Sequence, residues 1–131
     1  MTIFSGQDIA DDGESPYQRP NSIGPQNLPR GQRTPQRWFD RANFVPPLYT
    51  WGTVGRNTVI SPGIVNCDLS LMKEFPIREK RHFQLRFEAF NALNHPNCGT
   101  PNNNLTSPAF GTISSTQTSM RVLQVELKLI F

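Results

Sequence analysis

Residues 81–90 have the sequence RHFQLRFEAF, and this stretch decides the fold class. Its apolar and polar side chains alternate: the odd positions hold Phe83, Leu85, Phe87 and Ala89, and the even positions hold His82, Gln84, Arg86 and Glu88. A period of two places one set on each face of an extended chain. The stretch is therefore predicted to be a β-strand with one apolar face and one polar face.

The same alternation occurs before and after this stretch, in residues 66–75 (NCDLSLMKEF) and residues 121–131 (RVLQVELKLIF). Both place apolar residues at odd positions, although Met72 and Lys73 interrupt the first. Residues 76–80 (PIREK) form a short connection that suits an antiparallel turn with its proline outside the ladder. An all-β fold is therefore predicted, with an antiparallel meander in the C-terminal half.

A tight turn centred in this short connection also predicts a register. It pairs Leu71 with Leu85 and Asp68 with Glu88, and it brings Arg86 within reach of both carboxylates. Because a slip of one residue would exchange the two faces of the strand, the alternation favours this register.

The first half of the chain has a different character. Eight of the 12 prolines fall at or before Pro62, and residues 1–62 show no sustained period of 2 or 3.6. We therefore predict a long irregular segment rich in Pro and Gly over residues 1–62, followed by the strands within residues 63–131. No run approaches the roughly 18 apolar residues of a membrane helix, whereas a transmembrane β-strand needs only alternation.

Composition and motifs argue against several function classes. The chain has 131 residues with 36% hydrophobic residues and a net charge of +3, and its arginines never form a run of like charge that would track nucleic acid. The two cysteines lack C-x-x-C spacing, and His82 and His95 have no second ligand nearby in the sequence. No catalytic, cofactor or metal motif is present, so no enzyme, cofactor or metal site is predicted.

The connections between the predicted strands differ in length. The first is residues 76–80, whereas residues 91–120 separate the second strand from the third. Short turns on one side and long loops on the other are typical of outer-membrane barrels, although a soluble sandwich could show the same asymmetry. Residues 1–10 contain no secretory signal pattern.

Four aromatic residues in the first half leave three interpretations open. They are Trp38, Phe39, Phe44 and Trp51. They could form a binding surface, anchors at a membrane interface, or a small hydrophobic cluster that holds a loop together.

Three stretches carry a family resemblance: residues 51–77, residues 83–115 and residues 120–131. Their most specific pieces are Gly55-Arg56-Asn57, Asp68-Leu69-Ser70-Leu71, Phe87-Glu88-Ala89-Phe90-Asn91 and Asn94-His95-Pro96-Asn97. In this order the pieces resemble the C-terminal end of TonB-dependent outer-membrane receptors of the Oar-like type. These receptors are common in acidobacteria and carry an N-terminal carboxypeptidase-regulatory-like domain. Cys67 and Cys98 depart from the family pattern, which usually has an aromatic residue at these positions.

The resemblance implies that the strands are the last ones of a large transmembrane barrel of about 22 strands that carries a plug. The final strand would run inward and end at Phe131, forming a signal for the barrel assembly machinery through Leu123, Val125, Leu127, Leu129 and Phe131. The side chains expected to face the lumen are Arg86, Glu88, Gln124, Glu126 and Lys128. The implied partners are outer-membrane lipid, the assembly machinery, and the rest of the barrel with its plug. No nucleic-acid partner is expected.

The leading hypothesis is therefore a C-terminal fragment of a TonB-dependent receptor or transporter in the cell outer membrane, without catalysis of its own. Two alternatives stay open. One is a small soluble β-rich binding module with a proline-rich arm, and the other is a non-functional truncated remnant.

Overall fold

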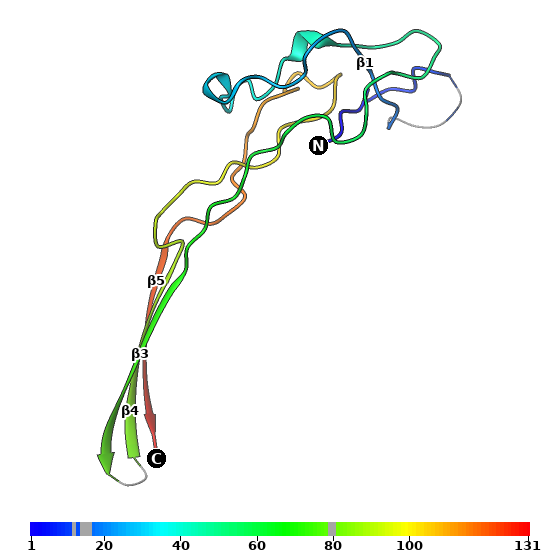
Figure 1. Ribbon diagram of the computed structural model, residues 1–131. Coiled ribbons are helices and arrows are strands. Elements are labelled where there is room, and N and C mark those ends of the chain that lie inside the picture. Colours follow the sequence, from blue (N-terminus) through cyan, green and yellow to red (C-terminus); the bar gives the residue numbers. More distant parts are fainter. Residues whose placement is uncertain (12, 14–16, 79–80) are drawn as a thin grey trace. The chain divides into compact units, whose positions relative to one another are not determined.

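The computed structural model describes residues 1–11, 13, 17–78 and 81–131. The chain divides into two compact units. The first comprises Met1–Gly63 and Cys98–Ser115, and the second comprises Ile64–Asn97 and Thr116–Phe131. Within the described residues the regular structure consists of antiparallel sheets and two 3-10 turns, which confirms the all-β fold class (Figure 1).

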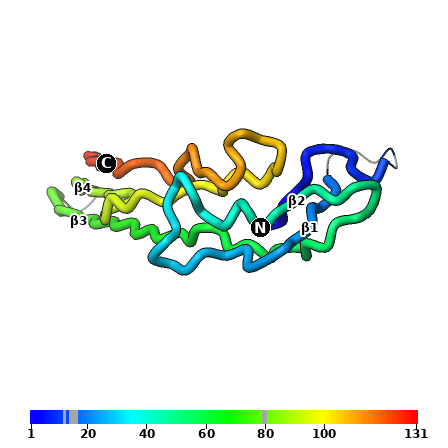
Figure 2. Tube along the Cα trace, turned by 90° about the horizontal axis from the view of Figure 1, so that it is seen from above, coloured from blue at the N-terminus to red at the C-terminus, as the bar shows by residue number. Residues whose placement is uncertain are grey.

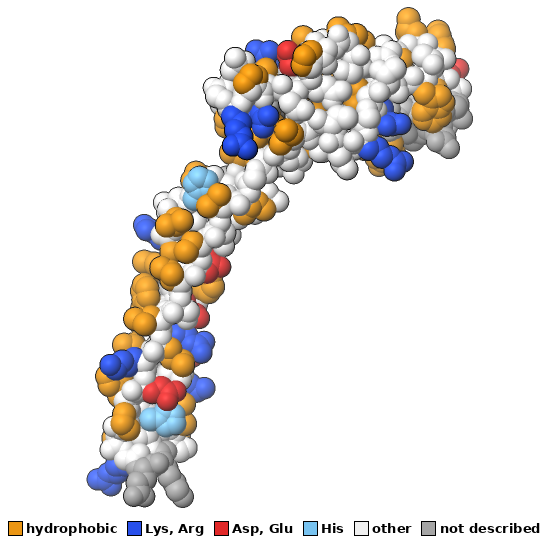
Figure 3. All heavy atoms as spheres, in the orientation of Figure 1, with side chains coloured by type: hydrophobic (Ala, Val, Ile, Leu, Met, Phe, Trp, Pro, Cys, Tyr) orange, Lys and Arg blue, Asp and Glu red, His pale blue; other side chains and the backbone are white. Residues whose placement is uncertain are grey.

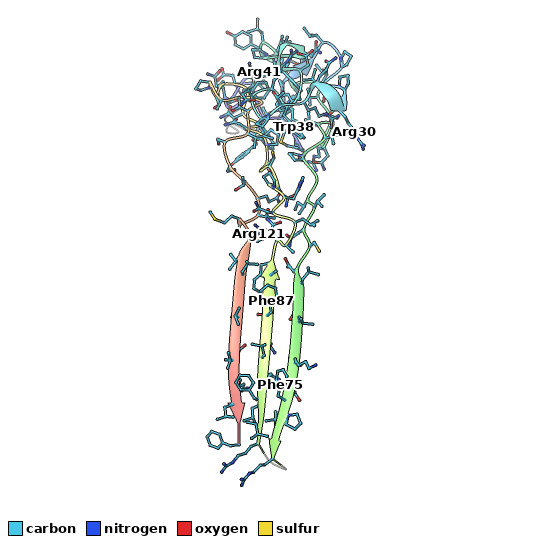
Figure 4. All side chains as sticks on the ribbon, turned by 90° about the vertical axis from the view of Figure 1, so that its left-hand side faces the viewer. Arg30, Trp38, Arg41, Phe75, Phe87 and Arg121 are labelled. Carbon is cyan, nitrogen blue, oxygen red and sulfur yellow. The ribbon has the colours of Figure 1, made fainter. Side chains whose placement is uncertain are left out.

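The second unit is built on a three-stranded antiparallel sheet in the order β3-β4-β5 (Figure 4). Its strands are β3 (Leu69–Arg78), β4 (Arg81–Phe90) and β5 (Val122–Ile130). Strand β4 lies in the centre and pairs with both neighbours. The sheet is thus the antiparallel meander that the alternation predicts, and β4 covers the same ten residues as the stretch that decided the fold class.

The predicted register is wrong by two residues. Leu71 lies opposite Phe87, not Leu85, and Glu88 lies opposite Ser70, not Asp68. Arg86 lies opposite Met72 and makes no ion pair with Asp68. A shift of two residues keeps every side chain on its expected face, so the alternation could not detect the error.

The cause of the error is the position of β3, which has the predicted ten residues but lies three residues farther toward the turn. This strand begins at Leu69 and continues through Pro76 to Arg78. The register is irregular between Pro76 and Arg78. The proline therefore lies within the ladder, opposite His82, and not in a turn as predicted. Proline is tolerated there because β3 has a neighbour on one side only among the described strands. Residues 79 and 80 of the predicted turn lie outside the described residues.

The first unit contains little regular structure. A two-stranded antiparallel sheet joins β1 (Asn21–Ser22) to β2 (Phe44–Val45), which lie beside each other in Figure 2. Two 3-10 turns, η1 (Arg30–Gln32) and η2 (Arg41–Asn43), complete its regular elements within the described residues. Because these elements are so short, side-chain packing and loop hydrogen bonds must hold the unit together.

That packing is a small hydrophobic core, formed by Ile3, Phe39, Phe44, Val54, Val59 and Phe110. The rings of Phe39, Phe44 and Phe110 meet edge to face, with centroids 5.0 to 5.6 Å apart. Such aromatic pairs add about 0.5–1.5 kcal/mol each beyond their buried area. Phe110 comes from the long connection between β4 and β5, so residues 98–115 belong to the first unit.

The core decides among the three interpretations of the aromatic residues. Phe39 and Phe44 are buried in it, and Trp38 packs against it partly buried. Trp51 is 59% exposed and lies outside the cluster. Three of the four residues therefore hold the unit together, and Trp51 does not.

Candidate functional site

The odd-numbered residues of the three strands form one apolar face. The register aligns them in rows such as Leu71, Phe87 and Val125, or Phe75, Phe83 and Leu129. Leu71 is 70% exposed and Val125 is 64% exposed, so nothing among the described residues covers this face (Figure 3). Contiguous apolar surface of this kind marks a contact with a partner or with lipid.

Lys73 is an exception on the apolar face, in the row with Leu85 and Leu127. Its Nζ atom lies 5.7 Å from the centroid of the Phe75 ring, within the distance of a cation–π contact. The aliphatic part of a lysine side chain can cover apolar surface while its ammonium group reaches a polar environment. The face is therefore apolar with one cation in its middle rows, Lys73, and a second, Arg81, at the start of β4. The sequence alternation already showed Lys73 as an interruption.

The even-numbered residues form the opposite face, which is polar apart from Met72, Pro76, Phe90, Val122 and Ile130. They include all five residues predicted to line a lumen. Arg86 lies opposite Glu126, and its Nη1 atom is 3.8 Å from Glu126 Oε2. The same Nη1 atom is 3.9 Å from Glu88 Oε1. Gln124 lies opposite Glu88. The structure thus gathers one arginine between two carboxylates. Its side chain is 40% exposed, and pairs this open to water contribute at most about 1 kcal/mol.

The polar row continues toward the turn end of the sheet. Gln84 donates a hydrogen bond from Nε2 to Glu74 Oε1 (2.9 Å), and Lys128 lies opposite Gln84 on the other side. Lys128 makes no ion pair with any described residue. The polar face is a ladder of alternating charge and amide groups, well suited to contact water.

Sequence analysis missed two buried asparagines that tie the chain together beyond the strands. Asn97 is 1% exposed, donates from Nδ2 to the Val65 carbonyl (2.9 Å) and to Thr118 Oγ1 (2.9 Å), and accepts from the Val65 N–H (2.7 Å). The Gln117 N–H donates to the Asn97 carbonyl (2.8 Å). One side chain therefore cross-links the segment before β3 to the segment before β5.

Asn91, next to the end of β4, also cross-links separate segments of the chain. It adopts a left-handed backbone conformation with φ 48°, which asparagine tolerates better than most residues. Its Nδ2 donates to the Ser119 carbonyl (3.0 Å) and its N–H donates to Asp68 Oδ1 (2.8 Å). Asp68, expected to face Glu88, instead caps this turn. The available sequence signal for these two residues was the high asparagine content of residues 91–97. Which of these amides are buried is seen only in the folded structure.

The first unit relies on close backbone contacts. A Cβ atom at Gly52 would come within 1.9 Å of the Arg19 carbonyl oxygen, so only glycine fits there. The Val54 N–H donates to the Pro20 carbonyl (3.1 Å), which holds the two segments together. Asn57 adopts φ 56°, and its N–H donates to Thr2 Oγ1 (3.1 Å). The Gly55-Arg56-Asn57 piece is thus a turn that is attached to the N-terminal segment.

No group of three or more His, Cys, Asp or Glu side chains among the described residues comes together as a metal site. Cys67 and Cys98 are free thiols, each partly buried. No helix in the described part of the chain has the length and hydrophobicity to cross a membrane.

The edges of the sheet are open. Strands β3 and β5 each pair with β4 alone among the described strands, so each leaves a row of unpaired backbone groups. The residues predicted as the assembly signal lie on β5 or just after it, and Leu123, Leu127 and Phe131 are 60%, 64% and 89% exposed. An amphipathic antiparallel sheet with two open edges is the structure expected of a segment from a larger barrel wall.

Comparison with known proteins identifies that class. The model of the outer membrane beta barrel domain family matches residues 1–124. The chain therefore belongs to this family, and its strands are those of an outer-membrane barrel. Neither curated proteins nor solved structures show a significant match.

Proposed function

We propose that the chain is the C-terminal part of a TonB-dependent outer-membrane receptor or transporter of the Oar-like type. It contributes barrel wall and has no catalytic role of its own. The sheet with one lipid-compatible face, one charged face and two open edges carries this proposal. The resemblance of residues 51–77, 83–115 and 120–131 to Oar-like receptors supplies the finer identity, including a carboxypeptidase-regulatory-like domain elsewhere in the complete protein.

The two faces suggest two environments. In a barrel, the row of Leu71, Phe87 and Val125 contacts outer-membrane lipid, and the row of Arg86 and Glu126 contacts the lumen or the plug. Unpaired backbone groups cost several kcal/mol each in lipid, so the open edges of β3 and β5 require further strands. The remainder of the receptor barrel is the partner that supplies them.

The exposed edge of β5 is the proposed contact for the barrel assembly machinery. Its odd-numbered side chains are apolar, and a strand edge can pair with an insertase by strand addition. Recognition would use backbone hydrogen bonds for affinity and the alternate side chains for specificity.

Purification from native outer membranes tests the proposal. An antibody raised against residues 21–45 should isolate a polypeptide much larger than the 14.8 kDa of this chain, with plug peptides detectable by mass spectrometry. The same polypeptide should form crosslinks to TonB in energised cells. A membrane product of the size of this chain, without plug peptides, would contradict the receptor assignment.

Accessibility labelling tests the assignment of the two faces. Phe87→Cys should react with a lipid-soluble probe in native membranes, and Glu88→Cys should react with a water-soluble probe. The two positions are neighbours in β4, so they are matched controls for each other. Equal reaction of both with the water-soluble probe would refute a lipid-facing side.

A further inference from the structure

The first unit contains a pocket that the barrel wall does not account for. It has a volume of about 440 Å³ and is lined by Arg30, Arg33, Trp38 and residues 60–63. Figure 4 shows Arg30 beside Trp38. The volume lies within the range of about 300–1,000 Å³ that is usual for small-molecule sites.

The 3-10 turn η1 sets the two arginines on one side of the chain. The Arg33 N–H donates to the Arg30 carbonyl (3.4 Å), and residues three apart eclipse each other in this geometry. Arg33 Nε donates to the Leu28 carbonyl (2.7 Å), which orients its guanidinium. A guanidinium has five N–H donors. The other Arg33 donors, and the whole Arg30 guanidinium, have no partner among the described residues.

Among the described residues no acidic side chain lines this pocket, so its described lining does not compensate the positive charge. Asp40, an acidic residue nearby in the sequence, already accepts from Arg37 (3.0 Å) and from Asn43 (3.2 Å). Two guanidinium groups without a carboxylate partner make a local site for an anion.

The rest of the pocket is held in place without a ligand. Trp38 donates from Nε1 to the Ile60 carbonyl (2.7 Å), and its backbone N–H donates to the Gly111 carbonyl (3.0 Å). The Ile60 N–H in turn donates to Asn27 Oδ1 (2.8 Å). A site whose walls are already ordered loses less entropy when a ligand binds.

We infer that this pocket binds an organic phosphate monoester. The phosphate lies between the Arg30 and Arg33 guanidinium groups, and an attached ring packs against Trp38. A monoester carries a charge of about −1.5 to −2 at neutral pH, which matches two guanidinium groups better than a single carboxylate does. Arginine binds phosphate through paired N–H donors, and an indole packs well against another ring. This inference does not depend on the receptor assignment.

Titration of the full chain in detergent micelles tests the site. Trp51→Phe leaves Trp38 as the single tryptophan, and Trp51 does not line this pocket. The indole Nε1–H resonance of Trp38 should shift and saturate with phenyl phosphate. Phenol, the uncharged analogue, should cause no saturable shift, and acetate should bind more weakly. Salt of about 0.5 M should weaken phenyl phosphate binding several-fold through screening.

Charge variants locate the anion. Arg30→Gln and Arg33→Gln should each weaken phenyl phosphate binding about tenfold, because each removes one charge-assisted contact. Arg56→Gln is the matched control: it removes the same charge from the same unit, outside this pocket, and should change binding less than twofold. Equal weakening by all three variants, or equal binding of phenol and phenyl phosphate, would overturn the inference.

A lipid arm distinguishes the source of the phosphate. Nanodiscs containing phosphatidic acid are compared with nanodiscs of phosphatidylcholine, and the same Trp38 resonance is followed. A shift with phosphatidic acid that Arg33→Gln abolishes supports the phosphate site with a lipid headgroup as its source. If neither phenyl phosphate nor phosphatidic acid shifts the resonance, the phosphate site is refuted.

Discussion

Replacing Asn97 by alanine should release the segments that precede β3 and β5. The wild-type side chain makes three hydrogen bonds, two with the backbone of Val65 and one with Thr118 Oγ1, while it is 1% exposed. Alanine can make none of them, and it removes the Asn97 side chain as the partner of the Val65 N–H and carbonyl. The perturbation removes polar contacts and leaves the apolar face of the sheet unchanged.

The expected loss follows from this count of hydrogen bonds. A hydrogen bond contributes about 1 kcal/mol net, and an unsatisfied buried group costs about 1–3 kcal/mol. Loss of three bonds should therefore lower the free energy of local opening by about 3 kcal/mol. Because about 1.4 kcal/mol corresponds to a factor of ten, the opening equilibrium should shift by roughly 100-fold.

Amide hydrogen exchange of the full chain in detergent micelles measures this shift. The Val65 and Gln117 amides, which bond directly to Asn97, should exchange roughly 100-fold faster in Asn97→Ala. Asn66→Ala is the control, because Asn66 is exposed and bonds only to Asp68 among the described residues, at 3.1 Å. Unchanged Val65 exchange in Asn97→Ala would refute the role of Asn97 as a cross-link.

Four further experiments test other parts of the structure. Phe110→Ala should destabilise the first unit by about 3 kcal/mol, measured by urea unfolding, because it empties part of a ring cluster; a loss below about 1 kcal/mol would contradict that core. Gly52→Ala should destabilise the first unit in urea unfolding, since its Cβ would overlap the Arg19 carbonyl oxygen; unchanged stability would show that the segments can separate freely. Arg86→Gln combined with Glu126→Gln in a double-mutant cycle should give a coupling below about 1 kcal/mol that fades with salt, and a larger, salt-insensitive value would place this pair away from water. Lys73→Leu should raise the free energy of unfolding in lipid vesicles by up to about 2 kcal/mol if its face contacts lipid, and no change would argue against that contact.

The strands illustrate which parts of the fold follow from local pattern. A period of two assigns every residue of β4 to a face, because successive side chains in a strand point to opposite sides. The register does not follow, since any shift by two residues preserves both faces. Proline misled the prediction: Pro76 indicated a turn, yet an edge strand accommodates a residue without an N–H.

In the first unit, by contrast, the local sequence pattern predicts almost none of the structure. Its residues have no period, so the sequence predicts only an irregular segment. Phe39 and Phe110 nevertheless meet with 5.0 Å between ring centroids, although β2, β3, β4 and their connections separate them in the chain. Packing between residues so distant in sequence has no local signal.

Alternation along the chain is enough to show that this protein is all-β, that three amphipathic strands form a meander, and that Arg86, Glu88 and Glu126 share a polar face. These properties depend on alternation, which is a local property of the chain. The register, the burial of Asn91 and Asn97, and the pocket between Arg30, Arg33 and Trp38 are visible only in the folded chain. These features depend on which distant segments meet, and hydrogen bonds and packing across space, not neighbours in sequence, select that arrangement.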